Sequence, residues 1–347
     1  MGGTCSSGSC KSWVVATTSA ANADLPGPRA GNGTGHFAFA TDGKNVVWID
    51  QDQGILEAPT AGGSSSSIVN LAPFQYSTTV FPGYVALESG VVVWAMGDVN
   101  NGISIYKAIE GATNSGSLVA SLGTVTAGDI PFGLALDAAG ANAYFLDSYN
   151  SANSNPKGPG VFKCDLMAKS CSNLHGESTS DVALADDIAV AGSNLFWTEA
   201  STGSVWRANY AQNSVSQIST TAVGPCLLTV DDTYVYWTEV GLADASRGAP
   251  ESFNVRRVPQ SASTPSTPTY VVANEGTPYG LATDGVYFYY SELDPSNNWF
   301  FNYVPIDGSV QPKSLKDGQE PVAIAAAGGA IYWLNYSDNT IDGIAAP

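Results

Sequence analysis

The sequence predicts an all-β protein built from seven similar units, and three observations carry this prediction. A short phrase recurs along the chain, in which an apolar run and a tight turn lead into β-branched residues and then an aromatic residue. The recurring aromatics, spaced 40 to 53 residues apart, are Trp48, Trp94, Phe145, Trp197, Trp237, Tyr290 and Trp333. Strand-like patterns fill each unit, and no amphipathic helix is needed. Four short strands in a repeat of this length are typical of a propeller blade. We therefore predict a seven-bladed β-propeller of four-stranded antiparallel blades, with residues 1–347 forming one domain.

The fourth unit shows the four expected strands most clearly. We name them a to d from the axis of the ring outward. Gly, Asn and Ser separate the strands, as expected for tight turns. The predicted strands a, b, c and d are residues 187–191, 194–199, 204–208 and 215–219. Further d strands are expected at residues 67–70, 117–120 and 269–273.

The seventh unit lacks a fourth strand of its own. Residues 340–344 supply strand c, and the chain then ends at Pro347. Residues 12–18 match the d pattern and precede the first unit, so we predict that this N-terminal strand closes the last blade. Closure would also remove an exposed sheet edge, which is otherwise a hazard for aggregation. We expect residues 1–11 to form a Cys-rich loop that ties down the closing strand.

The repeat resembles the YWTD-type propeller repeats of lipoprotein-receptor ectodomains and of secreted or lipid-anchored bacterial proteins. Residues 195–199 (LFWTE) and 235–239 (VYWTE) carry the resemblance, with Glu where that family has Asp. The receptor domains have six blades whereas seven units are counted here, so their ligand sites cannot be transferred. In that family the acid of the motif supports packing between blades.

The composition excludes several classes of function. There are 31 Asp and Glu against 13 Lys and Arg, which gives a net charge of −18. Binding to nucleic acid or to anionic membranes depends on clustered Lys and Arg, so neither partner is expected. No apolar run approaches the ~20 residues that span a bilayer. The charge favours solubility and attraction to basic partners, and we expect a monomer.

The cysteines favour an oxidising compartment. Cys5 and Cys10 lie close together in the sequence, as do Cys164 and Cys171, and we predict a disulfide within each pair. Zinc is disfavoured because the chain has only two His. Cys226 is left over, and we expect it to be a buried core residue rather than a reactive thiol. Since no signal peptide precedes Cys5, we expect Met1 to stand where an export sequence was removed, and we predict a secreted or cell-envelope protein.

Candidate ligand-binding residues gather on one predicted face. The b–c and d–a connections emerge on this face, and the longest insertions are b–c loops, at residues 148–160, 241–252 and 293–299. Long loops on a rigid scaffold commonly hold binding residues, although loops also drift in length at little cost. Aromatic residues can stack on sugars, although they can also fill the mouth of the channel. The candidates are His36, Tyr84, Phe132, Tyr149, Arg247, Tyr279 and Trp299.

An acid follows most of the anchor aromatics by two residues. These acids are Asp50, Asp147, Glu199, Glu239 and Glu292, with Asn335 as the seventh equivalent. Carboxylates that converge would suit Ca²⁺, but strand b is second from the axis and spreads them around a wide ring. We therefore expect hydrogen bonding between blades and no bound cofactor, with Ca²⁺ as the alternative.

The leading hypothesis is a non-catalytic extracellular binding module for a carbohydrate or a protein. No nucleophile elbow is present, and the predicted inner strands read as packing residues. We place His175 in the c–d hairpin, on the face opposite the insertions. The rival hypothesis is a metal-dependent propeller hydrolase or lactonase. A third hypothesis is a purely structural envelope protein.

Overall fold

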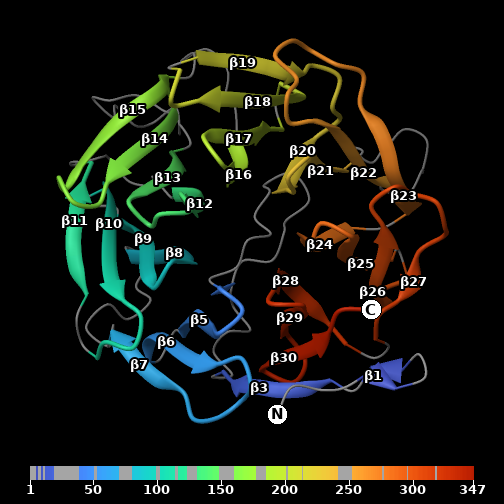
Figure 1. Cartoon of the computed structure of the whole chain (residues 1–347), viewed down its shortest axis with the longest axis horizontal. Coiled ribbons are helices and arrows are strands. Elements are labelled where there is room, and N and C mark those ends of the chain that lie inside the picture. The colour runs from blue at the N-terminus through green and yellow to red at the C-terminus, as the bar shows by residue number, and fades with distance from the viewer. Residues whose placement is uncertain are drawn as a thin grey trace.

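The structure is a computed structural model of the whole chain. It describes residues 5–6, 9–10, 12–18, 39–50, 53–69, 80–98, 102–113, 116–122, 131–147, 160–176, 185–200, 202–212, 214–240, 252–275, 277–294, 296–316 and 319–347. Seven four-stranded antiparallel sheets stand around a common axis, as predicted (Figure 1). All regular elements of the described residues are strands. Within that part of the chain, nothing resembles a helix long and apolar enough to cross a membrane.

The first three blades follow the chain in the order a, b, c, d. Blade 1 consists of β4 (Phe39–Thr41), β5 (Asn45–Asp50), β6 (Gly54–Pro59) and β7 (Ser66–Val69). Blade 2 consists of β8 (Val80–Glu88), β9 (Val91–Asp98), β10 (Gly102–Ile109) and β11 (Ser117–Ser121). Blade 3 consists of β12 (Pro131–Leu136), β13 (Asn142–Asp147), β14 (Gly160–Asp165) and β15 (Ser170–Gly176).

The next three blades repeat this order. Blade 4 consists of β16 (Ala185–Ala191), β17 (Asn194–Glu199), β18 (Ser204–Asn209) and β19 (Ser214–Ser219). Blade 5 consists of β20 (Pro225–Val230), β21 (Tyr234–Val240), β22 (Ser252–Pro259) and β23 (Thr269–Glu275). Blade 6 consists of β24 (Thr277–Thr283), β25 (Tyr287–Leu293), β26 (Trp299–Pro305) and the short β27 (Lys313–Ser314).

Blade 7 confirms the predicted closure by the N-terminal strand. It consists of β28 (Pro321–Ala327), β29 (Ala330–Asn335), β30 (Thr340–Ala345) and β3 (Trp13–Thr17). Strand β3 pairs antiparallel with β30, and Thr17 lies opposite Thr340. Before it, β1 (Cys5–Ser6) and β2 (Ser9–Cys10) form a small hairpin with Cys5 opposite Cys10. The side chains of these two cysteines lie outside the described part, so their disulfide stays a prediction.

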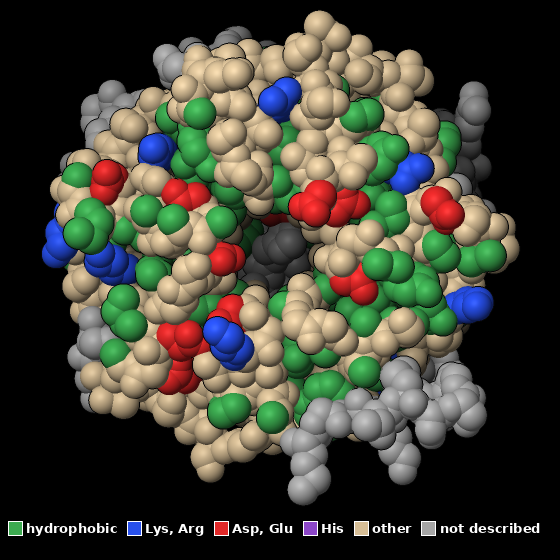
Figure 2. Space-filling model, in the orientation of Figure 1, with side chains coloured by type: hydrophobic (Ala, Val, Ile, Leu, Met, Phe, Trp, Pro, Cys, Tyr) green, Lys and Arg blue, Asp and Glu red, His purple; other side chains and the backbone are tan. Residues whose placement is uncertain are grey.

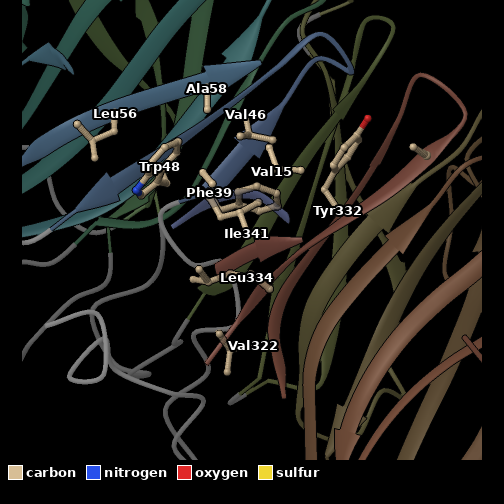
Figure 3. Close-up of a cluster of buried hydrophobic side chains, with 13 residues drawn as sticks. Val15, Phe39, Val46, Trp48, Leu56, Ala58, Val322, Tyr332, Leu334 and Ile341 are labelled. Carbon is tan, nitrogen blue, oxygen red and sulfur yellow. The ribbon is translucent and has the colours of Figure 1, made fainter. Parts of the chain in front are cut away.

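The seam between blades 7 and 1 is closed by more than the β3 ladder. The indole Nε1 of Trp13 donates to the carbonyl of Thr60, 2.8 Å away in blade 1. Figure 3 shows Val15 beside Phe39, Val46 and Ile341 in the buried cluster between the two blades. The a–b turns of the two blades also touch, backbone against backbone, at Gly43 and Gly328.

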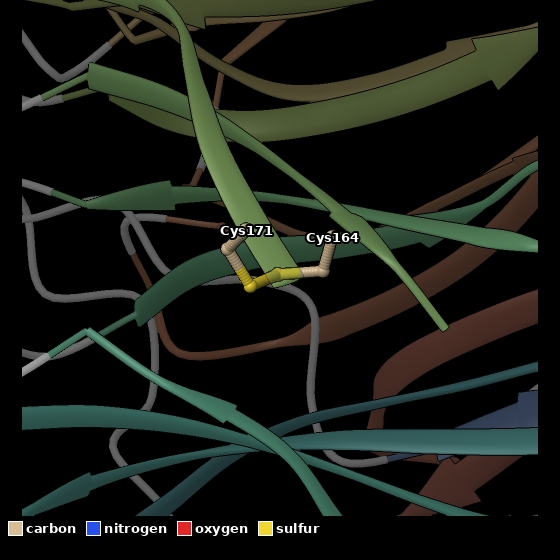
Figure 4. Close-up of a disulfide and its surroundings, with 2 residues drawn as sticks. All are labelled: Cys164 and Cys171. Carbon is tan, nitrogen blue, oxygen red and sulfur yellow. A yellow bond between two sulfur atoms is a disulfide. The ribbon is translucent and has the colours of Figure 1, made fainter. Parts of the chain in front are cut away.

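Apolar clusters fill the spaces between neighbouring blades, with one cluster at each of the seven junctions. The seven predicted anchor aromatics are all buried within these clusters. Burying one such side chain contributes roughly 1.5–3 kcal/mol, so the repeated aromatic is mainly a packing device. One predicted disulfide is confirmed, between Cys164 and Cys171 in the c–d hairpin of blade 3 (Figure 4).

A register shift interrupts the pairing of strands a and b in blades 2 to 7. It lies near the start of strand a, for example between Phe132 and Leu134 and between Pro278 and Gly280. A bulge bends its strand and re-aims a side chain. The residue within the shift therefore departs from the strict in–out alternation at the b–c/d–a face.

Candidate functional site

Two of the predicted ligand-binding residues contact each other on blade 6. Tyr279 lies in the bulge of β24, and Trp299 is the first residue of β26. Their ring centroids are 4.5 Å apart, with an angle of 55° between the planes. Both side chains are half-buried and pack on the cluster of the blade 7–blade 1 junction. The sequence placed these residues on one face, but it could not show that they touch.

The turn before Trp299 has its own internal hydrogen bonds. Asp294 Oδ1 accepts from the backbone nitrogens of Ser296 and Asn298, at 2.8 and 2.7 Å. Asp294 Oδ2 accepts from Asn298 Nδ2 at 2.9 Å. These bonds stabilise the charged carboxylate and hold its pKa below the ordinary value. Trp299 therefore follows directly on a turn that is held by its own hydrogen bonds. Phe300, the residue after Trp299, is 42% exposed.

The aromatic pair has the chemistry of a stacking site. Aromatic faces attract the apolar faces of sugars and the aliphatic parts of protein side chains. Two rings set at an angle form a corner rather than a flat platform. Both rings stand on strands, which position side chains more firmly than loops do.

Of the other candidate ligand residues, only Tyr84 has a described side chain, and it lies on blade 2, away from this corner. Tyr84 is only 5% exposed, which favours the packing role weighed for these aromatics. The side chain of Phe132 lies outside the described part, although its backbone belongs to β12. His36, Tyr149 and Arg247 also fall outside the described residues. A ligand role for these five residues stays a prediction.

The acids that follow the anchors act locally where their partners are described. Glu199 Oε1 accepts from the indole nitrogen of Trp197 at 3.2 Å, and its Oε2 accepts from Thr202 at 2.9 Å. Glu239 accepts in the same way from Trp237 at 3.2 Å. Asp50 is one methylene shorter and accepts from the backbone nitrogen of Gln53 at 3.1 Å instead. These contacts lie within a blade, whereas Glu239 also bonds to the backbone of Val223, in the connection from blade 4 to blade 5. Hydrogen bonding between blades stays a prediction for the ring of acids as a whole.

Glu239 also forms an ion pair within blade 5. Its Oε2 is 2.8 Å from Arg256 Nε, and both groups are largely buried. Burial raises the pKa of Glu239, while the bond from Trp237 and the charge of Arg256 oppose that rise. The Arg256 guanidinium then continues outward over the ring of Tyr270, 4.3 Å from its centroid.

The described acids that follow the anchors are spread over different blades. Among residues with described side chains, no group of three His, Cys, Asp or Glu is arranged to hold an ion. Glu199, Glu239, Glu292 and Asp50 are each buried in a different blade, and the side chain of Asp147 is not described. Ca²⁺ binding stays a prediction.

The predicted position of His175 is wrong. This residue lies in β15, opposite Val161, which is the second residue of β14 and therefore close to the b–c end of the blade. Its ring centroid lies 5.7 Å from that of Trp197 and 5.2 Å from that of Trp206, both in blade 4. Strand β15 continues for several residues past Cys171, which carries His175 away from the hairpin turn and toward the face that holds the insertions. Burial lowers the pKa of His175, and the nearby Glu199 carboxylate opposes this.

The inner strands are not purely apolar, contrary to the sequence interpretation. Asp187, in β16, is buried, and its Oδ1 accepts from the backbone nitrogen of Ile188 at 2.7 Å. Its Oδ2 accepts from the backbone nitrogen of Leu228 in β20, which ties blade 4 to blade 5. Cys226, expected in the core, is half-buried, and its sulfur lies 2.9 Å from Thr238 Oγ1. The sequence shows two acids before Ile188, but it carries no signal that one of them bonds to the neighbouring blade.

Comparisons with known proteins support the fold alone. No protein-family model and no curated protein matches the sequence. Among solved structures, the chain is similar to hydrazine synthase of Kuenenia stuttgartiensis, with a TM-score of 0.63 and 16% identity over 93% of this chain and 96% of that chain. It is also similar to the WD40 repeats of RRP9, with a TM-score of 0.61 and 10% identity over 96% of this chain and all of that chain. For BamB of Moraxella catarrhalis the TM-score is 0.53, with 13% identity over 88% of this chain and 84% of that chain. The chain is therefore a β-propeller, and these identities carry no ligand or activity with them.

Proposed function

We propose that this propeller is a non-catalytic, extracytoplasmic binding module. Its ligand, a carbohydrate or a protein, binds on the b–c/d–a face beside blade 6. The observation that carries the proposal is the contact between Tyr279 and Trp299, at 4.5 Å between ring centroids. The Cys164–Cys171 disulfide supports the location, since such bonds persist in oxidising compartments.

The proposal is tested by measuring binding of the purified protein to a glycan array and to a panel of extracellular proteins. Trp299→Ala should weaken binding at least tenfold, because it removes one wall of the aromatic corner. Tyr270→Ala is the control, because Tyr270 is an exposed aromatic, 58% accessible, on the outer strand of blade 5. Thermal unfolding of both variants establishes that they are folded.

Two results would overturn the proposal. One is the absence of binding to every glycan and protein tested. The other is equal binding by the Trp299→Ala and Tyr270→Ala variants. A stoichiometric metal ion together with turnover of a lactone would favour the rival hydrolase instead.

A further inference from the structure

The tip of blade 6 on the opposite face carries an apolar surface with acidic neighbours. The a–b turn contributes Val286, which is 62% exposed, and Tyr287, which is half-buried. The c–d turn contributes Ile306, whose backbone nitrogen donates to the carbonyl of Val286 at 3.1 Å. Tyr303 completes the surface, with its ring centroid 5.4 Å from that of Tyr287. We call these four residues the blade 6 tip.

Equivalent turns in other blades differ from the blade 6 tip. In blade 5, Thr233 occupies the position of Val286, since its nitrogen donates to Asp231 as that of Val286 donates to Asp284. Thr233 also accepts from Gln260 where Val286 accepts from Ile306. In blade 1 the same position is held by Lys44. A large exposed aliphatic side chain at this point is not required by the turn.

Negative charge flanks the blade 6 tip on both sides. Asp284 and Asp307 are exposed and lie in the same two turns as Val286 and Ile306. Figure 2 shows hydrophobic side chains gathered beside the central opening, over the region where Figure 1 places blade 6, with acidic groups on either side. Two basic groups are also near: Lys313 pairs opposite Tyr303, and Arg257 donates to the carbonyl of Ile306. Arg257 also stacks on Tyr234 at 4.4 Å from the ring centroid. A guanidinium therefore already lies on a tyrosine ring in blade 5, next to the blade 6 tip.

We propose that the blade 6 tip is a docking surface for a protein segment in which Arg or Lys flanks an apolar residue. The apolar residue would contact Val286 and Ile306, and its basic neighbours would meet Asp284, Asp307 and the tyrosine faces. The net charge of −18 adds long-range attraction for such a segment. A second copy of this chain is disfavoured as the occupant because its charge is the same. This site is separate from the Tyr279–Trp299 corner and does not depend on it.

The test uses a synthetic peptide of alternating Arg and Leu, with an alternating Glu and Leu peptide for comparison. Fluorescence anisotropy should show binding of the Arg peptide and none of the Glu peptide. Val286→Lys should weaken binding at least about tenfold, because it places a like charge in an apolar contact. Asp307→Asn should weaken it about threefold while keeping the oxygen that accepts from Ser309. Thr233→Lys, with the same charge change at the equivalent turn, should stay within about twofold of wild type.

The proposal is overturned if the Arg peptide does not bind, or if the Glu peptide binds equally well. It is also overturned if Val286→Lys and Thr233→Lys bind alike, since the peptide would then contact the acidic surface without using the blade 6 tip. Sedimentation that shows a dimer dissolved by Val286→Lys would assign the surface to a second copy and refute the proposed partner. Urea unfolding of each variant excludes loss of folding as the cause.

Discussion

The seam between the first and last blades gives the sharpest test of the closed ring. Gly43, in the a–b turn of blade 1, has a φ of 85° and faces the turn of blade 7. A Cβ built at Gly43 would lie 2.9 Å from the nitrogen of Gly328 and 3.0 Å from its Cα. Both atoms belong to backbone and cannot rotate away. We predict that Gly43→Ala destabilises the protein by forcing these two turns apart.

Gly285 provides a matched control in blade 6. It also has a φ of 85°, but a Cβ built there would meet nothing within 4 Å. The local hydrogen bonds match as well. Gly43 donates to Thr41 Oγ1 at 3.0 Å, and Gly285 donates to Thr283 Oγ1 at 3.1 Å. The cost of a positive φ, roughly 1–2 kcal/mol for an L-residue, is therefore common to both variants.

The difference in the free energy of unfolding between the two variants therefore measures the close contact at the seam alone. Overpacking against fixed backbone costs typically 1–3 kcal/mol, so Gly43→Ala should be about 2 kcal/mol less stable than Gly285→Ala. That is roughly a thirtyfold difference in the unfolding equilibrium constant. Urea unfolding followed by tryptophan fluorescence measures it, because the five anchor tryptophans are buried at blade junctions. Equal stability of the two variants would refute a closely packed seam.

Three further predictions concern single side chains. Val15→Ala should cost about 2 kcal/mol and Val14→Ala almost nothing in urea unfolding, because Val15 is 1% exposed and Val14 is 55% exposed on the same closing strand; equal losses would contradict the observed register of β3. Burial and the bond to Asp231 raise the pKa of Tyr236, so the melting temperature should fall above about pH 10 as the folded state resists ionisation, and Tyr236→Phe should flatten that fall. Burial lowers the pKa of His175, so the neutral imidazole is favoured in the folded state. The stability that this residue contributes is therefore fully present above about pH 6.5 and is lost as the pH falls below that value. The His175→Phe variant should show a smaller acid loss of melting temperature than wild type, and an identical acid profile would refute the role given to burial.

The fold was predictable because its determinants are local and repeated. An aromatic such as Trp197 follows a tight turn at a nearly fixed distance, and the same physical need recurs in every blade: one large side chain to fill each junction. The closing strand was predictable for a related reason. The seventh unit has three strands, and residues 12–18 contain a strand that belongs to no other unit, so this strand can complete the last blade. Repetition supplies many examples of one rule, and a single sequence can then reveal it.

The candidate sites depend on contacts that have no such repetition. Tyr279 meets Trp299 because a bulge in β24 re-aims one side chain and a five-residue turn returns the other to it. His175 lies near the face opposite to the predicted one because β15 continues past the hairpin turn as far as Gly176 and pairs His175 with Val161. Asp187 bonds to the backbone of the neighbouring blade, and no spacing rule predicts a contact 41 residues away. These are tertiary consequences of small backbone shifts.

The Glu and Asp variants of the repeat show how one methylene decides a structural role. Glu199 and Glu239 reach back to the indole nitrogen of their own anchor, at 3.2 Å in both cases. Asp50 accepts from the following turn instead, and the indole nitrogen of Trp48 has no hydrogen-bond partner among the described residues. Leaving a buried donor unsatisfied costs roughly 1–3 kcal/mol. Asp50→Glu should therefore supply an acceptor for the indole nitrogen of Trp48 and raise the midpoint of urea unfolding. Glu199→Asp should lower the midpoint, because it leaves the indole nitrogen of Trp197 without its acceptor. If both substitutions shift the midpoint in the same direction, the acid does not act through the indole, and its place in the repeat needs another explanation.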